Sequence, residues 1–138
     1  MKRLIAQWLI VFIVAMAVQS TLIPLVGIRG IVPDIAFLTL FVFCLQFGVM
    51  GGIWAGFVMG LLQDVYSPSI LGQNALAKTL AGAFIGVFNV RVMNTDPIAR
   101  VSLLVLAMLL HDMTFAFTDM LKSGSPLTME LLELVTIT

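Results

Sequence analysis

The sequence predicts an all-α polytopic membrane protein, a bundle of five transmembrane helices plus a partial sixth. Hydrophobic residues make up 61% of the 138 residues and charged residues only 10%, whereas a soluble domain carries about 25% charged residues. The mean hydropathy is +1.14. So few charges cannot cover a surface that faces water, and the apolar residues fall in runs long enough to cross a bilayer.

The whole chain is predicted to form a single transmembrane helical domain. Its spans cover about residues 4–26, 35–47, 48–64, 75–90 and 98–121, with an incomplete span at 126–138. The net charge is zero and Lys2-Arg3 is the one cluster of cations, which argues against nucleic acid as a partner. The single cysteine, Cys44, lies in an apolar run and is interpreted as a small core side chain.

The first span follows Lys2-Arg3 and runs from Leu4 to Val26. A signal peptide also begins with cations and an apolar run, and Ala15-Met16-Ala17 imitates a cleavage site. The apolar run continues past that point to the length that crosses a bilayer, and further apolar segments follow it. We therefore favour an uncleaved transmembrane helix.

The second span opens after a Gly-Ile-Arg-Gly turn at residues 27–30. Pro33 suits a first helical turn, and the carboxylate of Asp34 meets the positive end of the helix dipole. Residues 35–47 are short for a span, so this helix is expected to continue into the turn before the third span. Two helices joined so closely are expected to be antiparallel neighbours.

The third span, residues 48–64, is the element around which the bundle is expected to assemble. Glycine recurs at every fourth position, which places one stripe on one helix face. The stripe consists of Gly48, Gly52, Gly56 and Gly60. Each interior glycine costs a helix in water about 0.5–1 kcal/mol relative to alanine. In lipid the same stripe is useful, because small residues let another helix approach closely.

The fourth span, residues 75–90, follows a loop rich in Pro, Ser and Gly, and Asn74 is its expected N-cap. Lys78, Gly82 and Gly86 again recur every four residues. The two glycines give this helix a second small-residue face. We therefore predict that it packs against the glycine stripe of the third span.

The fifth span, residues 98–121, begins after Asp96-Pro97, where Asp96 fits an N-cap and Pro97 a first helical position. Residues 122–126 end it. The final residues, 126–138, would extend about 20 Å as a helix, against about 30 Å for the hydrocarbon core. The chain is therefore expected to stop inside a sixth span.

The placement of cations predicts a cytoplasmic N-terminus, because cytoplasmic loops carry the excess of Lys and Arg. With that orientation the inner side holds more of the loop cations than the outer side. The two sets are Lys2, Arg3, Arg91 and Arg100 inside, and Arg29 and Lys122 outside.

Polar side chains in or beside the spans are the candidate functional residues: Asp64, Asn74, Lys78, His111, Asp112 and Asp119. The predicted topology puts Asp64, Lys78, Asp112 and Asp119 in the outer half of the membrane, where charges usually mark a partner or a pathway. One interpretation is an outward-facing polar pocket, or a proton relay through His111 and Asp112. The other, which we favour, is a structural ion pair of Lys78 with Asp64 or Asp112.

No catalytic set and no metal site are visible in the sequence. One histidine excludes a multi-histidine metal site, and neither a cysteine pair nor a His-x-x-x-His spacing occurs. The glycine stripe lacks the preceding strand and the Gly-Lys-Ser/Thr ending of a phosphate-binding loop. The sequence therefore predicts neither an enzyme nor a cofactor.

Three motifs lie within residues 33–86: Pro33-Asp34 opening a span, the passage ending Gly60-Leu-Leu-Gln-Asp64, and Leu71-Gly72-Gln-Asn-Ala75-Leu76. In this order and spacing they resemble the MreD family of bacterial rod shape-determining proteins. The resemblance implies an inner-membrane protein of the cell-elongation machinery with no known catalytic activity. It also implies association with the single-span protein MreC, with the actin-like MreB and with peptidoglycan synthases. The spans of the family look similar in arrangement to the S-components of energy-coupling-factor transporters.

Three functions follow from these features. An assembly scaffold is favoured, because the predicted loops are short and nothing outside the membrane is large enough for chemistry. The alternative is a small-molecule-binding subunit of a membrane transporter, with a pocket formed by Asp64, Asn74, Lys78, Asp112 and Asp119. An ion or proton channel ranks last, because the inner halves of the predicted spans have almost no polar residues.

Overall fold

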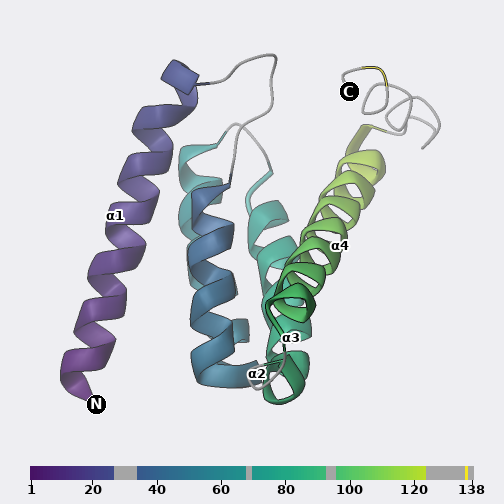
Figure 1. Cartoon of the computed structure of the whole chain (residues 1–138). Helices are drawn as coiled ribbons and strands as arrows, with labels where there is room; N and C mark the ends of the chain where they lie inside the picture. Colours follow the sequence, from purple (N-terminus) through teal and green to yellow (C-terminus); the bar gives the residue numbers. More distant parts are fainter. Residues whose placement is uncertain (27–33, 68–69, 93–95, 124–135, 137–138) are drawn as a thin grey trace.

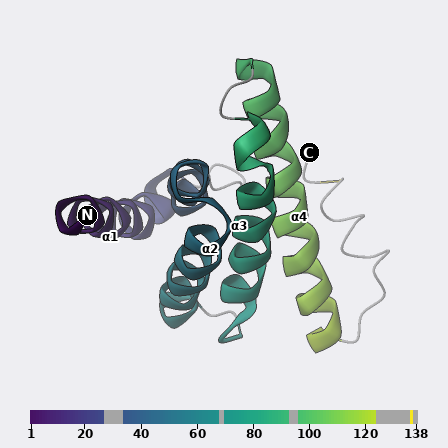
Figure 2. The ribbon, with the colours of Figure 1, turned by 90° about the horizontal axis from the view of Figure 1, so that it is seen from below.

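The computed structural model describes residues 1–26, 34–67, 70–92, 96–123 and 136, and the regular structure of these residues is helical throughout. The elements are α1 (Lys2–Val26), α2 (Ile35–Tyr66), α3 (Gln73–Val92) and α4 (Pro97–Ser123), as Figure 1 shows. They follow one another in a row, in which α1 packs on α2, α2 on α3 and α3 on α4 (Figure 2). The predicted all-α class is confirmed.

Two of the predicted spans lie in one element, because α2 changes direction at Gly48. The φ of 73° and ψ of −158° at this residue are not helical and belong to a region that is open essentially only to glycine. The sequence predicted that Gly48 begins a helical glycine stripe, and this prediction is wrong for Gly48. This residue forms the bend between a first segment of α2 (residues 35–47) and a second segment (residues 49–66). The described residues thus give four helical elements, and five separate helices are not shown.

The two segments of α2 fold back toward each other (Figure 1). A straight helix from Asp34 to Gly56 would be about 33 Å long at 1.5 Å per residue. Lys78 nevertheless reaches both positions, since its ammonium lies 2.6 Å from the Asp34 carboxylate and its carbonyl oxygen lies against Gly56. The bend at Gly48 makes this possible.

The core lies where both segments of α2 meet α3 and α4. Phe37 and Leu40 are fully buried in the first segment, Met59 in the second, Ile85 in α3 and Ala107 in α4. These side chains come from four separate stretches of the sequence. The bend in α2 is therefore needed to assemble this core.

Helix α1 joins the bundle through an aromatic contact near one end and a hydrogen bond near the other. The rings of Trp8 and Phe43 meet edge to face with centroids 5.1 Å apart. Oε1 of the buried Gln19 accepts a hydrogen bond of 2.9 Å from the backbone N–H of Ala36. That bond satisfies one of the N–H groups that the start of α2 leaves without a partner in its own helix.

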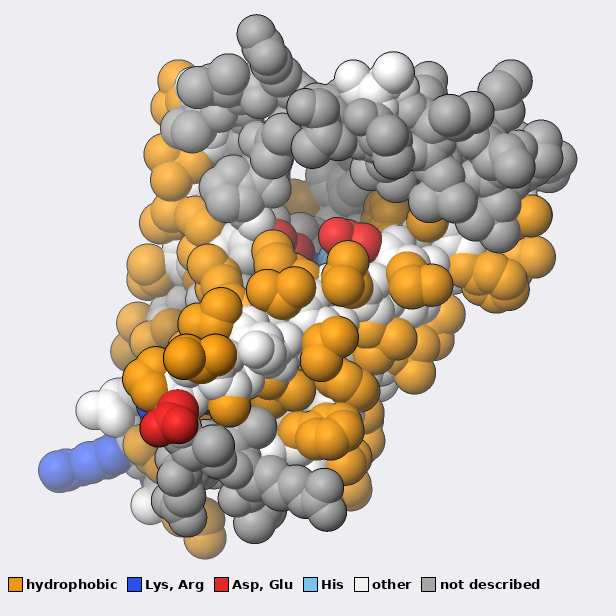
Figure 3. Space-filling view, turned by 45° about the vertical axis from the view of Figure 1, so that its right-hand side comes forward, with side chains coloured by type: hydrophobic (Ala, Val, Ile, Leu, Met, Phe, Trp, Pro, Cys, Tyr) orange, Lys and Arg blue, Asp and Glu red, His pale blue; other side chains and the backbone are white. Residues whose placement is uncertain are grey.

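Large apolar side chains cover much of the outer surface (Figure 3). Trp54 on α2 is 63% exposed and Met113 on α4 is 71% exposed, which suits contact with lipid rather than water. In the described residues three helices are long and apolar enough to cross a membrane, judged by length and composition: Lys2–Leu22, Ile35–Tyr66 and Pro97–Lys122.

Helix α3 was predicted as a span, and it is not one of these three helices. Polar residues such as Lys78 and Asn89 interrupt its apolar sequence, and both are buried. The helix lies between α2 and α4, which cover much of its surface. Polar side chains on the covered faces therefore do not contact lipid.

The observed first residue of α4 agrees with the sequence prediction, whereas that of α3 differs from it. Helix α4 begins at Pro97, as predicted. Helix α3 begins at Gln73, one residue before Asn74, which the sequence had suggested as its N-cap. Of the predicted incomplete span at residues 126–138, only residue 136 lies within the described part of the chain.

Candidate functional site

The second segment of α2 and α3 touch backbone to backbone. A Cβ atom at Gly52 would overlap the carbonyl oxygen of Gly82, and a Cβ atom at Gly82 would overlap that of Gly52. A Cβ atom at Gly56 would overlap the carbonyl oxygen of Lys78. Only hydrogen fits at these positions, so the glycines set how closely the two helices approach.

Two further glycines extend this contact toward the ends of the helices. A Cβ atom at Gly60 would overlap the backbone of Ala75, and one at Gly86 would overlap the backbone of Val49. Gly48 differs from these, since a Cβ atom there would meet only Nδ2 of Asn89 at an ordinary 3.7 Å. Its positive φ, and not crowding, requires glycine at the bend.

Lys78 and Asp34 form an ion pair inside the bundle. The Lys78 side chain is fully buried, that of Asp34 is 22% exposed, and Nζ lies 2.6 Å from Oδ2. Asp34 also caps α2, because its Oδ1 accepts a 2.9 Å hydrogen bond from the backbone N–H of Phe37. The sequence had named Asp64 or Asp112 as the partner of Lys78. The observed partner is Asp34 because the first segment of α2 folds back against α3.

His111 connects this ion pair to α4. Its Nε2 lies 3.4 Å from Nζ of Lys78, and its Nδ1 lies 3.1 Å from Oδ1 of Asp112. The His111 side chain is 12% exposed and that of Asp112 is 75% exposed. Asp34, Lys78, His111 and Asp112, which we call the charge cluster, therefore form a continuous chain of polar contacts across α2, α3 and α4. Figure 3 shows acidic side chains at a hollow in a mostly apolar face.

Asp64, at the end of α2, caps the beginning of α3. Its carboxylate accepts hydrogen bonds of 2.9, 3.0 and 3.1 Å from the backbone N–H groups of Gly72, Asn74 and Ala75. It also accepts one of 2.9 Å from Nδ2 of Asn74. Asp64 is 3% exposed, and a carboxylate at a helix N-terminus is stabilised by the helix dipole. Asp64 thus does the capping that the sequence had assigned to Asn74.

Asp119 lies on α4 two turns beyond Asp112 and is partly buried. The described residues contain no group of three or more His, Cys, Asp or Glu side chains that could hold a metal ion. The structure therefore places the predicted polar residues in two groups, one around Lys78 and one around Asp64, with Asp119 farther along α4.

Sequence reasoning missed three polar contacts that join the helices. The sequence predicts a role for Asp34 at the start of its own helix, and it does not predict the ion pair with Lys78. Gln19 bonds to the backbone of Ala36, and Nε2 of Gln73 donates a 3.1 Å hydrogen bond to the carbonyl oxygen of Phe115. Asp34 is an isolated charged residue in an apolar run, which is a signal that could have marked it. Gln19 and Gln73 each stand beside another polar residue and carry no such signal.

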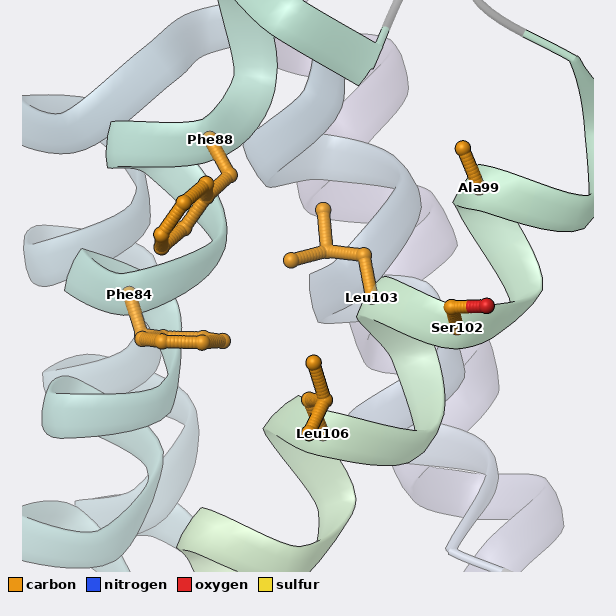
Figure 4. Close-up of a pocket in the computed structure, with 6 residues that line it drawn as sticks. All are labelled: Phe84, Phe88, Ala99, Ser102, Leu103 and Leu106. Atoms are coloured by element: carbon orange, nitrogen blue, oxygen red, sulfur yellow. The ribbon is translucent and has the colours of Figure 1, made fainter.

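An apolar pocket of about 230 Å³ opens between α3 and α4 (Figure 4). Phe84 and Phe88 line it from α3, and Leu103 and Leu106 from α4. None of the predicted polar site residues lines it. This pocket is therefore separate from the charge cluster and does not match the polar pocket that the sequence suggested.

The fold and the site together define a class. Apolar helices with lipid-compatible faces, joined by a glycine contact and a buried ion pair, make this chain a multi-pass membrane protein. The family model of the rod shape-determining protein MreD matches residues 2–129 of the 138-residue chain. The chain belongs to this family.

Membership of the family makes the chain a rod shape-determining membrane protein of bacteria. The family is not known as a family of enzymes. No curated protein and no solved structure matches the chain. The likeness to S-components of energy-coupling-factor transporters therefore stays a prediction.

Proposed function

We propose that the chain is a non-catalytic scaffold of the cell-elongation machinery in the bacterial inner membrane. It binds the single-span protein MreC and, with it, takes part in a complex that includes MreB and peptidoglycan synthases. The observation that carries the proposal is the family match over residues 2–129. The N-terminus lies in the cytoplasm, as the bias of Lys and Arg toward that side favours.

The contacts of the polar residues support a scaffold more than a ligand pocket. Lys78 is engaged with Asp34 and His111, and the carboxylate of Asp64 accepts hydrogen bonds from three residues at the start of α3. Buried charges that are paired in this way hold helices in one arrangement. The helices then present a fixed outer surface.

That outer surface is apolar on several helices. Ile13 on α1, Trp54 on α2 and Met113 on α4 are 66%, 63% and 71% exposed. A partner with a single transmembrane helix gains dispersion contacts by packing on such a face and displacing lipid. A bitopic partner therefore suits this surface better than a polar solute does.

Copurification tests the proposal. The tagged chain is purified in mild detergent from membranes that contain the elongation proteins, and bound proteins are identified by mass spectrometry. MreC is expected in a fixed ratio to the chain. Absence of MreC, together with a tightly held small molecule, would contradict the scaffold and support the transporter alternative, which no present observation favours.

Site-specific photocrosslinking locates the partner. A photoreactive amino acid is placed singly at Ile13, Trp54 or Met113, and the matched control is Met59, which is 1% exposed. At least one exposed position is expected to crosslink to MreC, while Met59 is not. Equal crosslinking from Met59 would mean that the apolar faces are not the binding surface.

A further inference from the structure

The contacts of His111 determine where its proton lies. The Lys78 ammonium has only donors and no acceptor, so the 3.4 Å contact with Nε2 is a hydrogen bond only if Nε2 carries no proton. Nδ1 then carries the proton and donates it to Oδ1 of Asp112 at 3.1 Å. The arrangement thus corresponds to a neutral imidazole that accepts from α3.

We infer that His111 is a proton-sensitive link between α4 and α3: neutral His111 accepts a hydrogen bond from Lys78, and protonated His111 releases it. Histidine is the side chain that ordinarily changes charge between about pH 5 and 8. An imidazolium has donors at both nitrogens, so protonation replaces the hydrogen bond with two cations in contact. This property belongs to the fold and goes beyond the proposed role as a scaffold.

Lys78 cannot relieve the repulsion by moving away. Its ammonium is held by Asp34 at 2.6 Å, its side chain is fully buried, and its backbone lies against Gly56. His111 is held less firmly, because its side chain is 12% exposed and its other partner, Asp112, is 75% exposed. The response to protonation is therefore expected in α4.

The charges around His111 come from three elements. Lys78 of α3 opposes a positive charge on the ring, while Asp112 of α4 and Asp34 at the start of α2 favour one. Helix α1 carries its titratable side chains, Lys2 and Arg3, only at its beginning. The rings of Phe37 and Phe115, with centroids 5.2 and 6.5 Å from that of His111, add no charge.

Side-chain hydrogen bonds tie this part of α4 to α3. One is the Lys78–His111 contact, and another joins Nε2 of Gln73 to the carbonyl oxygen of Phe115. Loss of the Lys78–His111 contact weakens this connection. Acidification is therefore expected to let the end of α4 move away from α3 and α2.

The chain contains one histidine, so its protonation can be followed directly. The full chain is prepared with ¹⁵N-histidine in lipid nanodiscs, and the imidazole nitrogen signals are recorded from pH 8 to pH 5. At pH 8 the spectrum is expected to show a proton on Nδ1 and none on Nε2. A proton on Nε2 at pH 8 would overturn the inference.

Spin-label distances report the movement. Labels are attached through Tyr66→Cys at the end of α2 and Leu121→Cys near the end of α4, in a Cys44→Ser background; both sites are exposed. The distance is expected to shift reversibly to longer values between pH 8 and pH 5. Its midpoint should coincide with that of the imidazole titration.

The control is His111→Gln, whose amide oxygen can accept from Lys78 at every pH. Its distance should stay at the high-pH value throughout. An unchanged distance in the parent protein, or an equal shift in His111→Gln, would overturn the inference. If His111→Gln does not fold, the parent titration still decides.

Discussion

The backbone carbonyl of Lys78 lies against Gly56, while the ammonium of the same residue lies 2.6 Å from the carboxylate of Asp34. One residue of α3 thus fixes both segments of α2. The glycine contact brings the backbones together, and the ion pair sets how the first segment lies against α3. The two interactions act at the same point and are expected to depend on each other.

The close contact predicts that alanine will destabilise the bundle at Gly52. In an ordinary helix, Gly→Ala is favourable by about 0.5–1 kcal/mol. At Gly52 the new methyl would overlap the carbonyl oxygen of Gly82, and such overpacking typically costs about 1–3 kcal/mol. The stability of Gly52→Ala in detergent micelles, measured by thermal unfolding, should therefore fall. Val58→Leu, which adds a methylene on a half-exposed position of the same helix, should change it little. A Gly52→Ala protein more stable than the parent would refute the close contact.

The bend predicts a different kind of cost at Gly48. Space is available for a Cβ atom there, but the φ of 73° and ψ of −158° strain any L-residue with a side chain. We expect Gly48→Ala to lose about 1–3 kcal/mol. The loss should appear in the same unfolding measurement, and it should not be relieved by trimming Asn89 to alanine. Relief by Asn89→Ala would show that crowding, and not backbone conformation, is the cause.

How much of the fold follows from the sequence depends on how local each determinant is. The glycine stripe and the start of α4 at Asp96-Pro97 can be predicted, because each depends on residues only a few positions apart. The Asp34–Lys78 pair joins residues 44 apart in the chain, and it forms only because Gly48 reverses α2. A stripe of four equally spaced glycines gives no sign that its first member is a bend. Similarly, the position of Asn74 in the sequence suggests an N-cap. The capping by Asp64 depends on how α2 and α3 meet in space, which the local sequence does not show.

The ion pair predicts that Lys78→Met will be strongly destabilising. The substitution leaves the largely buried Asp34 carboxylate without its cation, and breaking one side of a buried pair costs about 3–5 kcal/mol. A second change, Asp34→Asn, should restore much of the loss, since asparagine still caps a helix and carries no charge. The amount of folded protein in the membrane and its thermal unfolding measure both effects. If the double variant is no better than Lys78→Met, the pair is not the cause.

The capping role of Asp64 predicts a smaller loss. Asp64→Asn removes the charge at the start of α3 and one of two accepting oxygens, each of which receives two hydrogen bonds. We expect a loss of about 1–3 kcal/mol, because the new amide group leaves two N–H groups of this capped turn without their acceptor. The matched control is Asp96→Asn, at the exposed start of α4, which should be nearly neutral. Equal effects of the two substitutions in thermal unfolding would contradict the assignment.

Rescue of cell shape tests most directly whether the contact between α2 and α3 carries the function. A rod-shaped bacterium is depleted of its own copy of this protein and then expresses the parent chain, Val58→Leu or Gly52→Leu. The three proteins are brought to matched levels in the membrane, and the ratio of cell length to width is measured. The parent and Val58→Leu should restore rods, and Gly52→Leu, which forces bulk against Gly82, should leave the cells rounded. Rods restored equally by Gly52→Leu would contradict the account.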